Sequence, residues 1–395
     1  MVIAGEASGD LLAAELVTTV RERLAQRQAR PTSDSQPLQA SLEPEFFGAG
    51  GTAMKAAGVD LAFDLTAHAV VGLVEVLKNY KSFRRLFLQL LKLAIARQPH
   101  AIICVDFSGF NRRFAHAVQK HVRHQSAFLN WHPKLIQYVS PQVWASRAGR
   151  ADKMARDFDL LLSIFPFEKE WYARRVPGFR VEFVGHPLVD RYRSLSQTEG
   201  DTTQWPPLVV LLPGSRDSEL NRHLPVMREA LAAMQREIDL RWEMVVPNES
   251  LADRAKREFS GISGGAIRSG GLAEALPRAD LAIASTGTVT LECAWFGVPV
   301  VALYKTSWTT YQVGKRVVKV RFLAMPNLLA DEQIYPELIQ GEATGAKIAE
   351  ASVKLLRNPA QRQAIRAKLK NVVDRLGPPG AAGRAADATL DLLSV

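Results

Sequence analysis

Cysteine is scarce in this sequence, with two residues among 395. Cys104 and Cys293 both lie in apolar stretches typical of a buried strand or helix, and neither has a neighbour at metal-ligand spacing. The two thiols therefore indicate neither a disulfide nor a metal site, and they fit a reducing compartment.

Long apolar runs are also missing. No uninterrupted run approaches the roughly 18 to 20 residues that a membrane-spanning helix needs. The first residues show no basic segment, apolar core or cleavage site of an export signal. With 47% hydrophobic and 23% charged residues, the composition is that of a globular protein. We therefore expect a cytoplasmic protein that does not cross a bilayer.

Acidic residues are outnumbered, with 40 Asp and Glu against 50 Lys and Arg, which gives a net charge of +10. Such an excess favours an anionic partner: nucleic acid, an acidic lipid surface or phosphorylated substrates. No recognised nucleic-acid-binding signature accompanies the charge, so we expect no nucleic acid partner. No G-x-G-x-x-G follows a predicted strand, which disfavours a nicotinamide dehydrogenase.

Short apolar runs alternate with helical patterns along the whole chain, which predicts an α/β fold. The length favours two domains. Between 186 and 207 the apolar content drops, and we place the boundary near 200, with domains at 1–200 and 201–395. Each is expected to be a parallel sheet that binds ligands at the carboxyl ends of its strands, with the active site in the cleft between the domains. The predicted strands are 2–4, 45–48, 101–105, 135–139, 160–164 and 181–184, then 208–213, 242–247, one near 265, 280–285 and 299–304.

The first turn after a strand carries "GEASGD" at 5–10. A helix that starts at Ser8, Gly9 and Asp10 presents free backbone N–H groups, which suit a phosphate. The alternative is that Ser8 or Asp10 merely caps the helix.

Two loops of the second half have the same strand-to-helix setting. Gly214, Ser215 and Arg216 place a permanent cation at a helix start, where a diphosphate would fit. The loop 285–288 offers hydroxyl and N–H groups, and Glu292 could accept from ribose hydroxyls. The alternatives are that Arg216 is an ordinary surface arginine and that Glu292 is a solvated residue of the helix.

In the first half, Asp106 ends the strand in "IICVDFSGFN". Catalytic groups collect at this edge of such sheets, so the carboxylate is a candidate general base or a group that orients one. The alternative is a cap for a helix that begins near Asn111.

Taken together, these stretches resemble one family, the lipid A disaccharide synthases, which are inverting glycosyltransferases of GT-B fold. Generic glycine loops contribute little to the resemblance, whereas "SPQVWA", "FPFEK" and "PNLLA" in this order are specific to it. Two positions, Gly109 and Ser146, depart from the usual family pattern. The matching pieces are 5–10, "GAGG" at 48–51 with Met54, 70–77, 105–111, 138–150, 165–172, 183–190, "LLPGSR" at 211–216 with Glu219, 285–292 and 325–330.

The resemblance implies transfer of 2,3-diacylglucosamine from its UDP donor to 2,3-diacylglucosamine 1-phosphate, with a β(1→6) linkage formed, UDP released, and no metal or cofactor. Asp106 matches the family's essential aspartate and is the expected base, or its assistant, for the acceptor 6-hydroxyl. The expected donor site comprises Gly214, Ser215, Arg216, Glu219, Ser285, Thr286, Gly287, Thr288, Glu292 and Asn327. The expected acceptor site comprises Glu6, Ser8, Gly9, Asp10, Glu75, Arg147 and Arg150. The alternative for Asn327, Arg147 and Arg150 is a structural role.

Acylated substrates require contact with a lipid surface, and the stretch 74–98 predicts it. Lys78, Lys81, Arg85 and Lys92 share one edge of a helix beside a broad leucine-rich surface. An ordinary core helix is the alternative. A second basic and aromatic stretch, 308–322, raises the same possibility. We expect peripheral association with the inner membrane, and the family suggests a homodimer. The last helix is expected to pack on the first domain or on a partner.

Two other readings stay open at this point. The second-domain loops alone would also serve a MurG-like transferase or a UDP-N-acetylglucosamine 2-epimerase. A catalytically silent membrane-surface relative would keep the fold without the reaction. Retention of Asp106, Arg216 and Glu292 together argues against a silent relative, and "VWAS" with "VDFSGFN" favours the lipid A enzyme.

Overall fold

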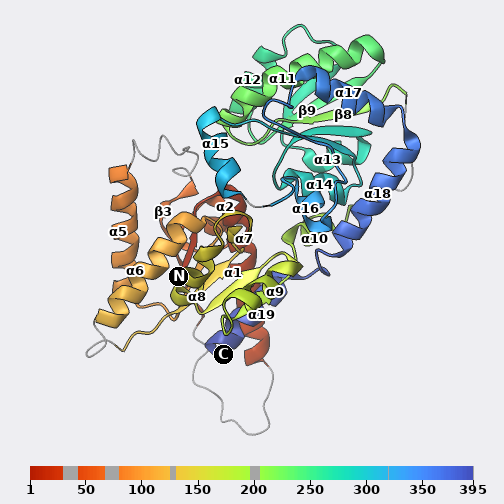
Figure 1. Ribbon diagram of the computed structural model, residues 1–395. Coiled ribbons are helices and arrows are strands. Elements are labelled where there is room, and N and C mark those ends of the chain that lie inside the picture. The colour runs from red at the N-terminus through yellow and green to blue at the C-terminus, as the bar shows by residue number, and fades with distance from the viewer. Residues whose placement is uncertain (30–42, 67–79, 125–129, 196–204, 319, 395) are drawn as a thin grey trace. The chain divides into compact units, whose positions relative to one another are not determined.

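The structure is a computed structural model, and it describes residues 1–29, 43–66, 80–124, 130–195, 205–318 and 320–394 (Figure 1). The chain forms two compact units: unit 1 is Met1–Asp190 with Leu376–Val395, and unit 2 is Arg191–Arg375. The boundary expected near residue 200 falls within 196–204, outside the described residues.

Unit 1 is built on a parallel sheet of seven strands in the order β3-β2-β1-β4-β5-β6-β7. Strands β1, β4 and β6 are almost wholly buried, which matches their continuous apolar runs. Because all strands point the same way, their carboxyl ends share one edge of the sheet. The strands are β1 Val2–Ala4, β2 Phe47–Gly50, β3 Asp60–Asp64, β4 Ala101–Val105, β5 Lys134–Tyr138, β6 Leu160–Ser163 and β7 Val181–Phe183.

Helices follow the strands of unit 1, as the alternating pattern predicts. The helices are α1 Ala7–Gln28, α2 Thr52–Ala56, α5 Tyr80–Arg97, α6 Ser108–His124, α7 Val143–Ser146, the 3₁₀ turn η1 Ala148–Arg150, α8 Ala151–Asp157, α9 Pro166–Arg175 and α10 Pro187–Tyr192, whose end lies in unit 2. The last helix, α19 Ala381–Leu393, also belongs to this unit.

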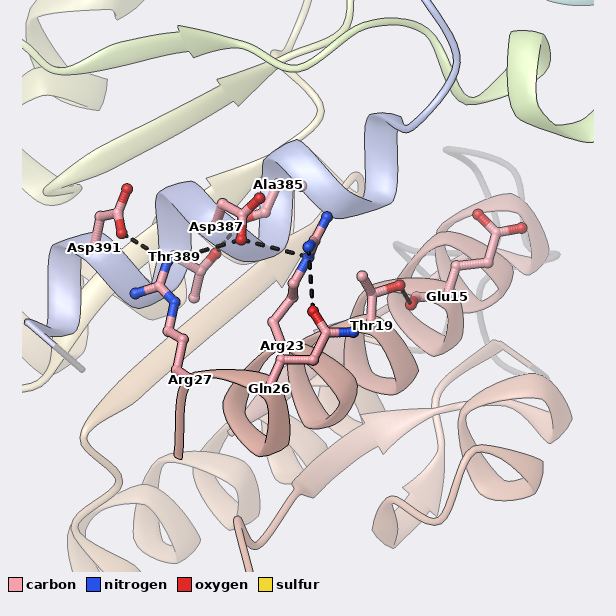
Figure 2. Close-up of polar contacts among 9 residues, drawn as sticks. All are labelled: Glu15, Thr19, Arg23, Gln26, Arg27, Ala385, Asp387, Thr389 and Asp391. Carbon is pink, nitrogen blue, oxygen red and sulfur yellow. Dashed lines mark hydrogen bonds and ion pairs between the residues drawn. The ribbon is translucent and has the colours of Figure 1, made fainter. Parts of the chain in front are cut away.

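Helix α19 lies along α1, nearly the whole chain length away in sequence. Arg27 of α1 donates to the Asp391 carboxylate at 2.8 Å, and Arg23 lies 3.5 Å from Asp387 (Figure 2). The start of α19 is held by Asp190, whose carboxylate accepts from the backbone N–H groups of Gly380 and Ala381. The motif "FVGHPLVD" therefore has a structural function, because it fixes the returning end of the chain to unit 1.

Unit 2 is built on a parallel sheet of six strands in the order β10-β9-β8-β11-β12-β13. The central strands β8, β11 and β12 are fully or almost fully buried. The strands are β8 Leu208–Leu212, β9 Arg241–Val246, β10 Gly265–Ser269, β11 Leu281–Ser285, β12 Val300–Tyr304 and β13 Glu337–Ile339.

The helices of unit 2 again alternate with strands. They are α11 Asp217–Glu237, α12 Glu249–Glu258, α13 Leu272–Ala275, the 3₁₀ turn η2 Leu276–Arg278, α14 Val289–Trp295, α15 Trp308–Val317, α16 Met325–Ala330, α17 Gly345–Leu356 and α18 Pro359–Asp374. Within the described ranges, no helix is both long and apolar enough to span a bilayer.

Candidate functional site

Asp106 lies directly after β4, at the carboxyl edge of the unit 1 sheet, and its backbone is strained. Asp106 has φ +48° and Phe107 has φ +37°, so two successive non-glycine residues adopt the left-handed region. Such backbone costs about 1 to 3 kcal/mol per residue and persists only where the surroundings hold it. The helix that follows, α6, begins at Ser108 and not near Asn111.

Two buried amides hold Asp106 in this conformation. Asn111 donates from Nδ2 to the Asp106 carbonyl at 2.8 Å, and Gln137 of β5 donates from Nε2 to the same oxygen at 3.1 Å. The Asp106 N–H donates to the Tyr138 carbonyl. Both amide side chains are fully buried. We did not predict these two residues from the sequence, although a glutamine in the apolar run "LIQYV" was a usable signal.

The opening corner "GEASGD" lies beside Asp106. A side chain on Gly5 would collide with the Phe107 ring, since a Cβ there would be 2.3 Å from Cδ1. A Cβ on Gly9 would lie 3.4 Å from the Asp106 Cβ. The first turn of α1 therefore packs against the candidate base, with Ser8 exposed and Glu6 half-buried at the N-cap position.

Asp10 serves the fold of this corner. Its carboxylate is 4% exposed and accepts from the N–H groups of Gly51, Ala53 and Met54. These bonds satisfy the start of α2 and link it to α1. The alternative that Ser8 or Asp10 caps α1 is wrong, because α1 begins at Ala7 with Glu6 as its N-cap. Asp10 instead caps the neighbouring helix, so its carboxylate faces backbone donors and not an acceptor phosphate.

Arginines gather near the start of α6 and in the α7–η1 segment. Arg150 is half-buried and Arg147 is exposed. Burial lowers the pKa of the Arg150 guanidinium, and the nearby charges of Arg147, Arg112 and Arg113 lower this pKa further. Mutually repelling cations of this kind are relieved by an anion. Glu75, the remaining acceptor-site candidate, lies outside the described residues.

The two motifs most specific to the resemblance meet inside unit 1. Trp144 of "SPQVWA" donates from Nε1 to Oε1 of Glu168 of "FPFEK" at 2.9 Å, and the Phe165 N–H donates to Oε2. Glu168 is fully buried, and this burial raises the pKa of its carboxyl from 4.5 to about 7, against the opposing effect of its hydrogen-bond donors. We did not single out Glu168 from the sequence, because a glutamate three residues into a helix is usually an N-terminal cap.

In unit 2, the loop after β8 adopts the expected strand-to-helix turn. Gly214 has φ +119°, and a Cβ on it would lie 2.4 Å from Glu219 Oε2, so only glycine fits. Glu219 accepts from the N–H groups of Ser215 at 2.9 Å and Arg216 at 3.2 Å. The Arg216 side chain is 64% exposed and lies 4.0 Å from Glu219. Glu219 thus shapes the loop, while the Arg216 guanidinium extends into solvent.

The loop after β11 is the neighbour of the β8 loop, because β8 and β11 are paired. Ser285 is buried, the Thr286 N–H donates to the Leu303 carbonyl, and Gly287 and Thr288 are exposed. The N–H group of Thr286 is therefore engaged by the sheet, and the exposed part of the loop is 287–288.

Glu292, expected to accept from ribose hydroxyls, already has protein partners. The Tyr192 hydroxyl donates to Oε1 at 2.8 Å, and the Arg191 guanidinium lies 3.7 Å away. Burial raises the pKa of Glu292, with Tyr192 and Arg191 acting in the opposite direction. The alternative of a solvated Glu292 is wrong, since its side chain is only 15% exposed.

Asn327 does not point its amide toward a ligand. The side chain is fully buried, Nδ2 donates to Tyr335 O and Glu337 Oε1, and Oδ1 accepts from the N–H groups of Ile334 and Tyr335. Every polar position of the amide is used to hold the segment before β13. The expected phosphate contact from this side chain is therefore replaced by a structural function.

Helix α5 is the described part of the predicted membrane-facing stretch. Arg85 and Lys92 are exposed, Leu88 is 44% exposed, and Leu90 and Ala94 are fully buried. Lys78 and the side chain of Lys81 lie outside what is described. The helix thus has one face in the core and a basic, partly apolar face outside. In unit 2, Trp308 at the start of α15 is 71% exposed.

Among the described residues, no three His, Cys, Asp or Glu side chains gather as a metal site would require.

Residues 1–385 match the family model described as lipid-A-disaccharide synthetase. The lipid-A-disaccharide synthase of Geobacter sulfurreducens is 35% identical over 403 aligned residues, covering 100% of this chain and 97% of the relative.

Solved structures show the same fold at low identity. The calicheamicin glycosyltransferase CalG4 superposes with a TM-score of 0.55 at 14% identity, covering 100% of this chain and 96% of that chain. MurG of Acinetobacter baumannii gives a TM-score of 0.51 at 13% identity, covering 100% and 98%. These structural similarities confirm two Rossmann-like units of the GT-B type. The sequence matches also identify the family. The chain belongs to the lipid-A-disaccharide synthetase family.

Proposed function

We propose that this chain transfers 2,3-diacylglucosamine from its UDP donor to the 6-hydroxyl of 2,3-diacylglucosamine 1-phosphate. The products are the β(1→6) disaccharide 1-phosphate and UDP. Family membership over residues 1–385 supports the synthesis of the lipid A disaccharide by a hexosyltransferase. MurG-like transfer or epimerisation is not favoured, because the relatives that match at 35% identity bear the lipid A name.

The observation that carries the proposal is the strained, doubly held Asp106. In an inverting transfer the acceptor oxygen attacks the anomeric carbon from the face opposite the leaving group, and its proton passes to a base. Asn111 and Gln137 hold the backbone carbonyl of Asp106 at the sheet edge. A carboxylate on a backbone fixed in this way is preorganised for this work, as base or as the group that orients it. The electron pair of the broken C1–O bond leaves on the UDP diphosphate.

On the donor side, the developing diphosphate charge would be met by Arg216 and by the exposed loop at Gly287 and Thr288. An arginine is suited to this task because its fork binds two phosphate oxygens and stays charged. Glu219 supports the loop through the N–H groups of Ser215 and Arg216 and does not itself contact phosphate. Glu292 is assigned to the ribose, together with its partner Tyr192.

On the acceptor side, the turn at Ser8 and Gly9 packs against Asp106, and the 1-phosphate is assigned to Arg147 and Arg150, whose repulsion an anion would relieve. The exposed basic face of α5 supports peripheral contact with the anionic inner face of the membrane. A homodimer is the assembly that the family resemblance suggests.

The decisive experiment measures UDP release in detergent from UDP-2,3-diacylglucosamine, with and without the acceptor. We expect acceptor-dependent release, with the disaccharide phosphate identified by mass spectrometry. Asp106→Asn should lower kcat by roughly 10³-fold, since it removes the base while preserving shape. Arg216→Ala should lose roughly 10²-fold in kcat/KM through the leaving group.

The matched control is Asp152→Asn, which changes an exposed carboxylate in the first turn of α8 and should retain wild-type turnover. If the chain binds UDP but does not release UDP in an acceptor-dependent way, the proposed identity of the acceptor is refuted. Full turnover by Asp106→Asn would refute the assignment of the base.

A further inference from the structure

His223 has no part in the reaction as described, yet it is fully buried beside the loop that follows β8. It lies in α11 with 0% of its surface exposed. Its Nδ1 lies 2.6 Å from the Pro213 carbonyl oxygen, and the Lys305 N–H donates to its Nε2 at 3.2 Å. Because a carbonyl can only accept, Nδ1 carries the proton and Nε2 is the acceptor. Burial lowers the pKa of this imidazole, in agreement with a neutral ring.

The two partners of His223 belong to different strands. Pro213 directly follows β8, and Lys305 directly follows β12. In the sheet, β11 lies between these two strands. A single side chain therefore connects the segments on either side of the strand that ends in the 285–288 loop.

One end of the connection is firmly anchored. The Lys305 ammonium donates to the carbonyl groups of Gln340 and Ala343. The Thr306 N–H donates to Oε1 of Gln340, and Nε2 of Gln340 donates back to the Thr306 carbonyl. Residues 305–306 thus form a fixed point next to β13. Through His223, this fixed point also holds the Pro213 carbonyl.

The other end leads directly to the donor loop. Pro213 precedes Gly214, whose φ of +119° turns the chain toward Ser215 and Arg216. The orientation of the Pro213 carbonyl therefore fixes where the Arg216 backbone begins. If His223 were lost, the buried Pro213 carbonyl and Lys305 N–H would be unpaired, and the loop would shift to satisfy them. Small displacements of a binding loop cost affinity steeply.

We propose that His223 is a positioning residue for the nucleoside diphosphate of the donor, which sets the Pro213–Arg216 loop by its two hydrogen bonds. This inference rests on the proposed function, because it assumes that this loop receives the diphosphate.

The test is calorimetric titration of the full chain with UDP, together with steady-state kinetics for each substrate. His223→Leu removes both bonds, and we expect roughly tenfold weaker UDP binding and a matching rise in donor KM, with acceptor KM unchanged. His223→Asn places an amide N–H where Nδ1 donates, and His223→Gln places an oxygen where Nε2 accepts. Each of these two variants keeps one of the two bonds. We therefore expect the logarithm of the loss in UDP affinity to be about half of that for His223→Leu.

A purely structural role would lower the folded fraction and hence kcat, without changing donor KM. His186→Leu is the matched control, since it removes another buried histidine, in unit 1, whose Nδ1 accepts from the Leu188 N–H. It should leave the UDP affinity of the folded protein unchanged.

UDP affinity within twofold of wild type in all three His223 variants would overturn the inference. Should His223→Leu fail to fold, wild-type affinity in both His223→Asn and His223→Gln would overturn it equally. Absence of UDP binding by the wild-type chain would instead overturn the proposed donor site. The two failures are therefore distinguishable.

Discussion

The buried carboxyl of Glu168 makes the stability of unit 1 depend on pH in an unusual direction. Its pKa is raised from 4.5 to about 7 by burial, so the folded state retains a proton that the unfolded state has released between these values. Stability therefore falls as pH rises through this window, whereas a salt-bridged carboxylate would show the opposite sign. A pKa shift of this size changes the free energy of unfolding by about 3 kcal/mol in total across the window.

Glu168→Gln removes the proton while preserving the shape of the side chain. The amide oxygen still accepts from Trp144, but the amide nitrogen cannot accept from the Phe165 N–H, so the variant loses part of the α9 cap at every pH. This cap loss cancels when two pH values are compared. From about pH 5 to about pH 8, we expect the variant to gain about 2 kcal/mol of stability relative to wild type.

Hydrogen exchange of the amides in β5 and β6, followed across a urea titration at both pH values, measures the opening of unit 1 directly. Glu170→Gln is the control, because this glutamate of the same helix is 76% exposed and ion-paired with Arg174 on the surface. For Glu170→Gln, the stability difference from wild type should be nearly the same at both pH values, so the difference between these two differences (the double difference) should be close to zero. A double difference for Glu168→Gln equal to that of the control would refute the claim that burial keeps the proton on Glu168.

Two further predictions concern residues that the structure assigns to the fold. Asn327→Ala should lower the stability of unit 2 by roughly 3 kcal/mol, because three buried backbone groups, the Ile334 N–H and the Tyr335 N–H and carbonyl, lose this partner. The folded variant should bind UDP as wild type does, and a loss of UDP affinity at unchanged stability in urea would instead indicate a phosphate contact. Asp190→Ala should cost roughly 1 to 2 kcal/mol and speed hydrogen exchange in α19, since two N–H groups of its N-terminus lose their carboxylate; exchange at the wild-type rate in α19 would contradict this.

Most of the strands that the sequence predicted have continuous apolar runs, and each predicted strand is present in the structure. β3, Asp60–Asp64, was missed because its residues alternate between exposed and half-buried, with an aspartate at each end. β13 was missed because its three residues begin with a charged glutamate and are all only half-buried. Such edge strands bury too little apolar surface to stand out in a sequence.

The candidate site was predictable as a set of loops but not as a set of side-chain directions. Asp10 and Asn327 both follow the pattern of ligand-binding residues, yet each turns toward backbone groups supplied by another segment. The same limit applies to His223, whose partner Lys305 is 82 residues away. Whether a polar side chain near a strand end faces a substrate or the protein depends on tertiary neighbours that local patterns do not contain.

The return of α19 to α1 has a consequence for the order of synthesis. Unit 2 is a continuous segment inserted into unit 1, so all of its residues leave the ribosome before the last segment of unit 1 does. During that interval the face of α1 that receives α19 is uncovered, and Arg23 and Arg27 have not yet met the aspartates of α19. Unit 2 can therefore fold first, and unit 1 is completed only when the residues of α19 arrive.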